Sequence, residues 1–330
     1  MKAVLCKAFG PPETLVVEEV PPLSPGDAEV VVTVHACGVN LPDSLVIAGK
    51  YQFKPPLPFS PGGEVAGTIK AVGPRVDRFR VGDRVIALPL YGGYAEELRV
   101  SHEQLLKLPE GIDFAQGAAF AISFGTAHYA LRERARIQPG ETLLVLGAAG
   151  GSGLAAIALG KLMGARVIAA ASTGEKLGLC AQQGADAVIN YADEDLRTRI
   201  VELTEGRGVD VIFDPACGAL AEGAIRCMAW NGRFLVIGFA SGEITKIALN
   251  LPLLKGFSIV GVSWGAFLQK EPERGATLME ELMSWFRQGE IRPYIESRLP
   301  LEEAARALAH LVQRKAMGKT VLIPDGRASS

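Results

Sequence analysis

A glycine-rich turn near the middle of the chain could hold the phosphates of a nucleotide. It lies in residues 143–153, Leu-Leu-Val-Leu-Gly-Ala-Ala-Gly-Gly-Ser-Gly, where an apolar run leads into a segment of small residues. Glycine has no Cβ, so it reaches unusual backbone angles and lets a pyrophosphate approach main-chain N–H groups at a helix N-terminus. Residues 151–156 fit the G-x-G-x-x-G/A pattern of dinucleotide-binding folds, although that pattern by itself is weak.

The segments after the turn predict the elements that would position it. Helices are expected over residues 154–163 and near 176–183. Short apolar runs are expected to be strands at residues 166–171, 187–189, 209–213, 233–238 and 258–262. Together with the strand before the turn they make two βαβαβ halves. This is the α/β, doubly wound parallel sheet of a Rossmann dinucleotide-binding domain.

The residues after the second expected strand favour NADPH over NADH. NAD-binding folds usually carry Asp or Glu there, because the carboxylate binds the ribose 2′-hydroxyl and repels a 2′-phosphate. This chain has Ser172 and Thr173 instead, followed by Lys176 one helical turn later. These side chains can donate hydrogen bonds to a phosphate, and the lysine neutralises its charge. Glu175 is the contrary detail, and we expect it to point to solvent or to cap the helix.

Length and composition indicate a protein of about two domains. The chain has 330 residues, 48% of them hydrophobic, and a formal net charge of −2. The near balance of charge predicts no nucleic-acid partner and no anionic membrane partner, and no apolar run reaches the roughly 18 residues of a membrane span. The five cysteines are scattered without paired spacing. They are typical of reduced thiols, so we expect a cytoplasmic protein.

The composition and the expected secondary structure of the chain change twice along its length. Residues 1–122 combine short β-like runs with Pro- and Gly-rich turns, which predicts a mainly β, barrel-like domain. Residues 123–262 carry the dinucleotide-binding pattern. The tail, 263–330, is too short for a third domain, so we expect it to complete the first one.

Several segments together resemble the medium-chain dehydrogenase/reductase superfamily, in particular its zinc-free NADPH:quinone oxidoreductase family. The resemblance covers essentially the whole chain. It is carried by the glycine turn and by residues 36–43 (Ala-Cys-Gly-Val-Asn-Leu-Pro-Asp), 49–51 (Gly-Lys-Tyr), 61–67 (Pro-Gly-Gly-Glu-Val-Ala-Gly), 92–96 (Gly-Gly-Tyr-Ala-Glu) and 189–191 (Ile-Asn-Tyr). It implies a GroES-like, mainly β catalytic domain made of residues 1–122 and 263–330, and a Rossmann domain over residues 123–262.

The resemblance also implies that no catalytic zinc is present. Zinc alcohol dehydrogenases of the superfamily place a ligand Cys where this chain has Asn40 and a ligand His where it has Gly63, and neither is a good zinc ligand. His35 and Cys37 could share one face of a strand, but no third ligand lies near them in the sequence. Without a Lewis acid, the easiest acceptor is one whose carbon is electrophilic by conjugation, such as a quinone, an enone or an enoyl thioester.

The resemblance assigns candidate residues to each part of the reaction. Asn40 and Tyr51 border the nicotinamide and the acceptor, where their amide and phenol could hydrogen-bond a developing negative charge. Alternatively, Tyr51 only packs and Asn40 only satisfies a turn. The other cofactor contacts that the resemblance implies are Thr126 at the domain bridge, Gly150, Gly151, Ser152 and Lys319 at the pyrophosphate, Ser172, Lys176 and Tyr191 at the 2′-phosphate, and Gly238, Phe239, Ser263 and Trp264 on the nicotinamide side.

These features predict an NADPH-dependent, zinc-independent oxidoreductase that transfers hydride to a quinone or another α,β-unsaturated carbonyl. Two alternatives stay open. The first is an enoyl or acryloyl thioester reductase, for which Lys50 and Lys54 are candidates to bind coenzyme A phosphates. The second is a non-catalytic NADPH-binding protein. By resemblance we also expect a homodimer formed through the sheet edges of the nucleotide domains.

Overall fold

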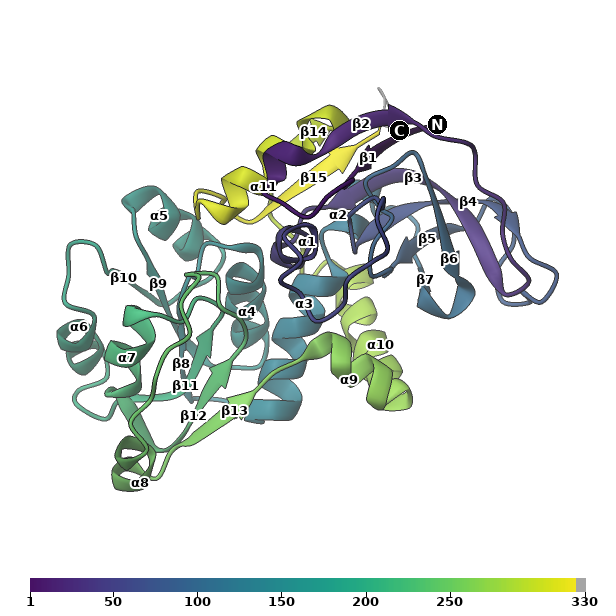
Figure 1. Ribbon diagram of the computed structural model, residues 1–330. Helices are drawn as coiled ribbons and strands as arrows, with labels where there is room; N and C mark the ends of the chain where they lie inside the picture. Colours follow the sequence, from purple (N-terminus) through teal and green to yellow (C-terminus); the bar gives the residue numbers. More distant parts are fainter. Residues whose placement is uncertain (325–330) are drawn as a thin grey trace. The chain divides into compact units, whose positions relative to one another are not determined.

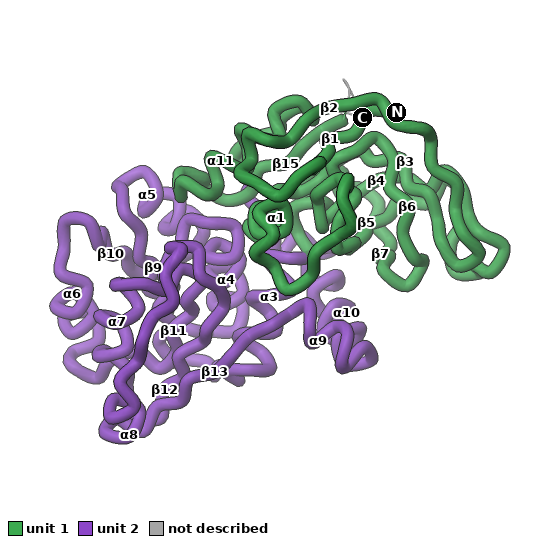
Figure 2. Tube along the Cα trace, viewed as in Figure 1, with its two compact units in different colours: residues 1–121, 295–330 green, residues 122–294 purple. Residues whose placement is uncertain are grey.

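The structure, a computed structural model, describes residues 1–324 of the chain. It divides into two compact units, shown in Figure 2. The first unit is Met1–Ala121 together with the chain from Ile295 onward, and the second is Ile122–Tyr294. A separate hydrophobic core lies in each unit.

The first unit is built on a mainly antiparallel sheet (Figure 1). Its strands follow the order β14-β15-β3-β4-β5-β7, and β6 also pairs with β3. The strands of this sheet are β3 (Glu29–Gly38), β4 (Val65–Val72), β5 (Arg84–Ala87), β6 (Glu97–Ser101), β7 (Leu105–Lys107), β14 (Ile295–Pro300) and β15 (Lys319–Ile323). The strands β1 (Lys2–Leu5) and β2 (Val16–Glu19) pair with each other in a separate two-stranded sheet. The helices are α1 (Leu41–Ile47), α2 (Phe114–Ala118) and α11 (Ala304–Val312). This arrangement confirms the mainly β domain that the sequence predicts.

Strand β3 brings distant parts of the first unit together. Its valines are fully buried, as expected for β-branched residues on a covered sheet. It ends at Gly38, where a Cβ would lie 2.1 Å from the Ala118 carbonyl oxygen, so the close packing of α2 here requires glycine. Strand β15 pairs with this end of β3, with Leu322 opposite Cys37. The last described strand therefore lies beside the segment that follows Gly38.

The second unit is a parallel sheet with the strand order β10-β9-β8-β11-β12-β13. Its strands are β8 (Thr142–Val145), β9 (Arg166–Ala171), β10 (Ala187–Asn190), β11 (Val209–Asp214), β12 (Met228–Val236) and β13 (Ser258–Gly261). Its helices are α3 (Ala121–His128), the π-helix η3 (Tyr129–Ala135), α4 (Gly151–Leu162), α5 (Gly174–Gln182), α6 (Leu196–Leu203), α7 (Ala219–Ile225), α8 (Asn250–Lys255), α9 (Trp264–Lys270) and α10 (Pro272–Gln288). The six expected strands and the Rossmann sheet are confirmed. The strand order reverses between β8 and β11, which is the topological switch point of such sheets.

Residues 263–294 belong to the second unit, whereas the sequence-based division placed them with the first. The apolar face of α10 is buried, with Leu282 and Phe286 fully covered. The neighbouring helix α9 stacks the Phe267 ring on Tyr129 of η3, with ring centroids 4.2 Å apart. These side-chain contacts, which sequence periodicity does not reveal, keep α9 and α10 with the second unit.

No helix within residues 1–324 is both long enough and apolar enough to cross a lipid bilayer.

Candidate functional site

The glycine turn lies at the switch point of the parallel sheet. After β8 the chain turns at Gly147, whose φ is +56°. The Leu146 N–H donates to the Phe213 carbonyl oxygen of β11, and the Ala148 N–H donates to the Ala170 carbonyl oxygen of β9. The turn is thereby tied to the carboxyl ends of both neighbouring strands, where ligands bind in open α/β sheets.

Gly153 and Gly150 of this turn differ in whether the packing around them requires glycine. A Cβ on Gly153 would lie 2.5 Å from the Ala148 carbonyl oxygen, so the turn cannot pack against α4 with any other residue. A Cβ on Gly150 would meet only the Gly147 carbonyl oxygen, at an ordinary 3.5 Å. Internal packing does not require glycine at 150, which is the pattern expected where a ligand needs the space. Gly150 caps α4 without a side chain, so the N–H groups of the first turn, at Gly151 and Ser152, fit a pyrophosphate.

The expected 2′-phosphate residues come together at the ends of β9 and β10. Ser172 directly follows β9, and the Tyr191 N–H donates to the Ala171 carbonyl oxygen at 3.1 Å. Lys176 lies in the first turn of α5. Thr173 caps this helix, because its hydroxyl accepts the Lys176 main-chain N–H at 3.3 Å. The main chains of Ser172 and Tyr191 therefore lie close together, and Lys176 follows in the first turn of the next helix, where its ammonium group could reach a phosphate ester.

Gly238 and Phe239 follow β12 on the same carboxyl side of the sheet. The Ile237 N–H donates to the Asp214 carbonyl oxygen, and a Cβ on Gly238 would lie 3.3 Å from the Pro215 carbonyl oxygen. The Phe239 side chain is 45% exposed. This loop is therefore held next to the loop that follows β11, with an aromatic ring left at the surface.

The residues that follow β13 lie against α3. Ser263 precedes α9, and Trp264 is buried on Gly125, where a Cβ would lie 2.6 Å from the indole Nε1. Thr126, the residue after Gly125, is half-buried on the same helix. Trp264 thus packs on the helix that carries Thr126, and its ring is covered by protein. Its Nε1 has no hydrogen-bond partner among the described residues.

A second group of polar side chains is buried in the first unit. Lys319 Nζ donates to Asn40 Oδ1 at 2.6 Å and to Glu64 Oε2 at 2.9 Å. Asn40 Nδ2 donates to Glu64 Oε2 at 3.1 Å and to the Gly38 carbonyl oxygen at 3.3 Å. Because lysine only donates and a carboxylate only accepts, these partners determine which way the Asn40 amide faces. Both amide hydrogens of Asn40 are directed at protein acceptors.

Asp43 and Tyr94 extend this buried group. Asp43 Oδ2 accepts the Asn40 main-chain N–H at 2.8 Å and the Tyr94 hydroxyl at 3.0 Å. Burial raises the pKa of Asp43 to about 6, although both hydrogen bonds and the charge of Lys319 act in the opposite direction. Tyr51 is half-buried, and burial, followed by the negative charge of Asp43, raises the pKa of its phenol. Tyr51 therefore stays a hydrogen-bond donor at neutral pH.

The donor set does not fit a catalytic metal. Among residues 1–324, no three His, Cys, Asp or Glu side chains form a group that could hold a metal ion. Asn40 is already bound to Lys319 and Glu64, and Gly63 has no side chain. The Cys37 thiol is fully buried, and burial raises its pKa well above the ordinary value, which disfavours the thiolate that binds zinc.

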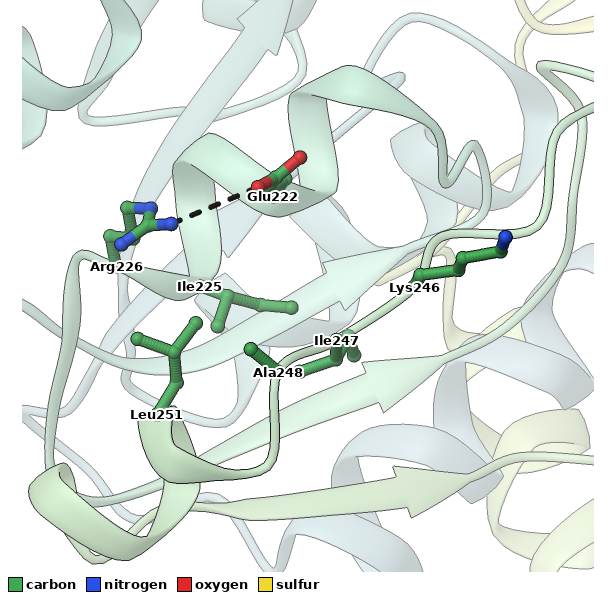
Figure 3. A pocket seen from close by; sticks show the side chains of 7 residues that line it. All are labelled: Glu222, Ile225, Arg226, Lys246, Ile247, Ala248 and Leu251. Carbon is green, nitrogen blue, oxygen red and sulfur yellow. Dashed lines mark ion pairs between the residues drawn. The ribbon is translucent and has the colours of Figure 1, made fainter.

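A small cavity lies elsewhere in the second unit, between α7 and the segment before α8 (Figure 3). Its volume is about 50 Å³, and Glu222 and Arg226 form an ion pair beside it at 3.7 Å. A water occupies roughly 30 Å³, so this cavity is far too small for a nucleotide. None of the expected site residues lines it.

Two family models match the chain. Residues 26–110 match "Alcohol dehydrogenase GroES-like domain", and residues 151–283 match "Zinc-binding dehydrogenase". A quinone oxidoreductase-like protein 2 homolog of Nematostella vectensis is 40% identical over 97% of this chain and 88% of its own length. A quinone oxidoreductase of Pseudomonas aeruginosa is 37% identical over 98% and 99%. The chain belongs to the quinone oxidoreductase family of the medium-chain dehydrogenase/reductase superfamily.

A solved structure of this family supports the same assignment. The crystal structure of Escherichia coli quinone oxidoreductase complexed with NADPH has a TM-score of 0.91, with 31% sequence identity over 98% of this chain and all of that one. The GroES-like fold of the first unit and the Rossmann fold of the second are therefore those of the family. Membership places this chain among oxidoreductases.

Sequence reasoning did not identify Asp43, Glu64 and Tyr94 as members of the buried group. The available signal was an acid in an otherwise apolar or glycine-rich segment, as at Glu64 between Gly63 and a buried strand. Lys319 was expected at the pyrophosphate. In the structure it is 4% exposed, and two of its three donors are directed to Asn40 and Glu64. Its contact with the cofactor stays a prediction.

Proposed function

We propose that this protein is an NADPH-dependent reductase that transfers hydride to a quinone or another α,β-unsaturated carbonyl without a metal. The observation that carries the proposal is the pair of residues at the positions where zinc alcohol dehydrogenases of the superfamily carry zinc ligands. Asn40 is held by Lys319 and Glu64, and Gly63 offers no ligand atom. An acceptor that needs no Lewis acid is one that conjugation already activates.

NADPH is the proposed cofactor. The glycine turn and the uncapped N-terminus of α4 fit a pyrophosphate, and Ser172, Lys176 and Tyr191 fit a 2′-phosphate. The E. coli relative was crystallised with NADPH. When bound, the cofactor supplies a hydride, that is, a proton and two electrons. The chain's own residues would bind and orient it through Gly150, Gly151, Ser152 and the loop at Gly238 and Phe239.

Tyr51 is proposed to donate a hydrogen bond to the acceptor oxygen while keeping its own proton. Burial and the nearby negative charge of Asp43 raise the pKa of its phenol, so the hydroxyl stays protonated at neutral pH. The sequence predicted that the Asn40 amide could donate a hydrogen bond to negative charge developing on the acceptor. In the structure, both of its amide hydrogens already have protein acceptors. We therefore assign Asn40 the role of holding Lys319 and Glu64 in place, and we assign its amide no catalytic role.

The reaction is tested by following NADPH and NADH oxidation at about 340 nm, the usual nicotinamide absorbance. Acceptors should include ortho- and para-quinones, simple enones and short enoyl thioesters. We expect NADPH to be preferred and quinones or enones to be reduced. Preference for NADH would overturn the 2′-phosphate site, and NADPH binding without turnover of any acceptor would favour a non-catalytic binding protein.

A thioester reductase is the second candidate. Lys50 and Lys54 are exposed on the same loop as Tyr51, where they could meet the phosphates of coenzyme A. In the acceptor panel this alternative predicts a lower KM for an enoyl-coenzyme A than for the same acyl group on a short, uncharged thiol. Equal KM values would exclude a role for the coenzyme A phosphates.

We also propose a homodimer through the β13 edge of the second unit. On β13 and the nearby helix α8, the side chains of Leu253, Leu254 and Ile259 are 79%, 70% and 40% exposed. An open strand edge next to exposed apolar side chains favours pairing with another chain. The free, buried cysteines fit a reducing compartment such as the cytoplasm.

A further inference from the structure

Asp43 is a buried acid that the expected site residues did not include. It lies in the first turn of α1 and is 4% exposed. Its Oδ2 accepts the Asn40 main-chain N–H at 2.8 Å and the Tyr94 hydroxyl at 3.0 Å. Tyr94 is itself fully buried. The carboxyl group is therefore anchored through one oxygen.

The other oxygen, Asp43 Oδ1, faces the main chain at Gly63. A Cβ on Gly63 would lie 3.8 Å from Asp43 Oδ1 and 3.2 Å from the Pro89 carbonyl oxygen. Apart from the chain neighbours of Gly63, no other heavy atom of the described residues would lie within 4 Å of it. Gly63 stands where zinc dehydrogenases of the superfamily carry a ligand His. Asp43 Oδ1 thus faces the space that a metal ligand fills in those enzymes.

The hydrogen bonds decide where a proton on Asp43 would reside. Oδ2 already accepts two donors, so the acidic proton belongs on Oδ1. Burial raises the pKa of Asp43 to about 6, so the protonated form is accessible near neutral pH. The titratable groups that act electrostatically on or with Asp43 are Tyr94, Lys319, Glu64, Cys37 and Tyr51.

We propose that Asp43 is the general acid of the reductase, and that its Oδ1 gives a proton to the acceptor oxygen. This inference rests on the proposed function. Hydride adds to the acceptor, and two electrons enter its conjugated system and leave negative charge on the oxygen. The O–H bond of Asp43 breaks, a new O–H bond forms on the acceptor, and water reprotonates the carboxylate. One hydride and one proton are consumed in each turnover, and the acceptor gains two hydrogens.

Tyr94 is a positioning residue in this scheme. Its hydroxyl holds Oδ2 and lowers the pKa of Asp43 relative to a carboxyl without this bond. A general acid is most effective when its pKa lies near the working pH. Removing the Tyr94 hydroxyl should therefore move the titration of Asp43 without removing the acid.

The test measures kcat/KM for 1,4-benzoquinone from pH 5 to pH 9 at saturating NADPH. The variants are Asp43→Asn, Tyr94→Phe and, as a matched control, Asp27→Asn. An asparagine carbonyl can accept both existing hydrogen bonds, so Asp43→Asn removes the acidic proton with little change of shape. Asp27 is an exposed acid of the same unit that pairs with Arg75 at the surface. NADPH binding, followed by nicotinamide fluorescence, reports whether each variant is folded and competent.

We expect wild-type kcat/KM to fall as the pH rises through the pKa of Asp43. Asp43→Asn should lose this pH dependence and fall by about 10²-fold or more at low pH. Tyr94→Phe should keep the pH dependence, with its midpoint moved upward by roughly half to one pH unit. Asp27→Asn should match wild type.

Two results would overturn the inference. One is an Asp43→Asn enzyme that keeps the wild-type rate or the same pH midpoint, and the other is a Tyr94→Phe midpoint that does not move. Failure of the proposed function looks different, because wild type would then bind NADPH but reduce no acceptor at any pH.

Discussion

Lys319 Nζ lies 2.6 Å from Asn40 Oδ1, although 279 positions separate the two residues in the chain. The contact exists because β15 returns to pair with the end of β3. It also brings the lysine within 2.9 Å of Glu64 Oε2. The buried Lys319 thus links the segment of Asn40 to the segment of Gly63 and Glu64. Asn40 and Gly63 stand where zinc dehydrogenases of the superfamily carry zinc ligands.

Replacing Lys319 with Met should destabilise the first unit strongly. The substitution leaves the fully buried Glu64 carboxylate without its cation, a loss of about 3–5 kcal/mol in the free energy of unfolding. Urea unfolding measures it. The exposed Lys315→Met is the control and should change stability by less than about 0.5 kcal/mol. Adding Glu64→Gln to Lys319→Met should recover part of the loss, and strictly additive effects would argue against the buried pair.

Replacing Lys176 with Glu should weaken NADPH use selectively. A charge-assisted hydrogen bond to the 2′-phosphate contributes about 1.5–3 kcal/mol, so KM for NADPH should rise roughly 10- to 100-fold. KM for NADH, which lacks this phosphate, should change little. The control is Arg207→Glu, an exposed charge reversal in the same unit. If KM for both cofactors rose equally, Lys176 would not contact the 2′-phosphate.

Two alanine substitutions separate a required glycine from a replaceable one. Gly125→Ala would place a Cβ 2.6 Å from the Trp264 ring, so it should lower the free energy of unfolding by about 1–3 kcal/mol. Gly265→Ala, on α9, meets no heavy atom within 4 Å and should be neutral or stabilising by up to about 1 kcal/mol. Denaturant unfolding distinguishes them. Equal effects would mean that Trp264 does not pack on Gly125.

The raised pKa of Asp43 predicts a specific dependence of stability on pH. Its pKa is about 6 in the folded protein against 3.8 as the ordinary value, so between these pH values the folded state holds a proton that the unfolded state has lost. Wild type should therefore lose about 3 kcal/mol from this group as the pH rises from about 4 to above 6. The Asp43→Asn variant should not lose this stability, because asparagine does not titrate.

Urea unfolding at pH 4 and pH 7 tests this linkage. The stability of Asp43→Asn relative to wild type should be higher at pH 7 than at pH 4 by that amount. An unchanged difference at the two pH values would show that the folded protein does not raise the pKa of Asp43.

Charge at the β13 edge should break the proposed dimer. Leu253→Glu places a carboxylate among apolar side chains that a second copy would cover, so the molecular mass in solution should fall to that of a monomer. Val201→Glu, at a 46% exposed position on α6, is the control and should leave the mass unchanged. Light scattering after size-exclusion chromatography measures both. A dimer in the Leu253→Glu variant would place the interface elsewhere.

The Rossmann sheet was predictable because its information is local. Most strands of the second unit contain a short apolar run, and their connections contain a glycine or a helix cap. The glycine turn could be located for the same reason. Gly147 needs its positive φ, and Gly153 has no room for a Cβ against its own neighbours in sequence.

The division of the chain was less predictable. Residues 263–294 read as a tail after the last strand, but stacking of Phe267 on Tyr129 and burial of the α10 face keep them in the second unit. Helical periodicity shows that a helix has an apolar face. It does not show which surface that face covers.

By itself, the sequence predicted the two kinds of fold, a phosphate-binding turn, and basic and hydroxyl residues that favour NADPH, because these depend on residue types at short spacing. The loss of zinc ligands at Asn40 and Gly63 followed from the resemblance of the sequence to its superfamily. Only the tertiary structure decided that Lys319 binds Asn40 and Glu64, and that Asp43 is anchored by Tyr94. The pairing of β15 with β3 and the burial of an acid arise from contacts between residues far apart in the chain, which no local pattern specifies.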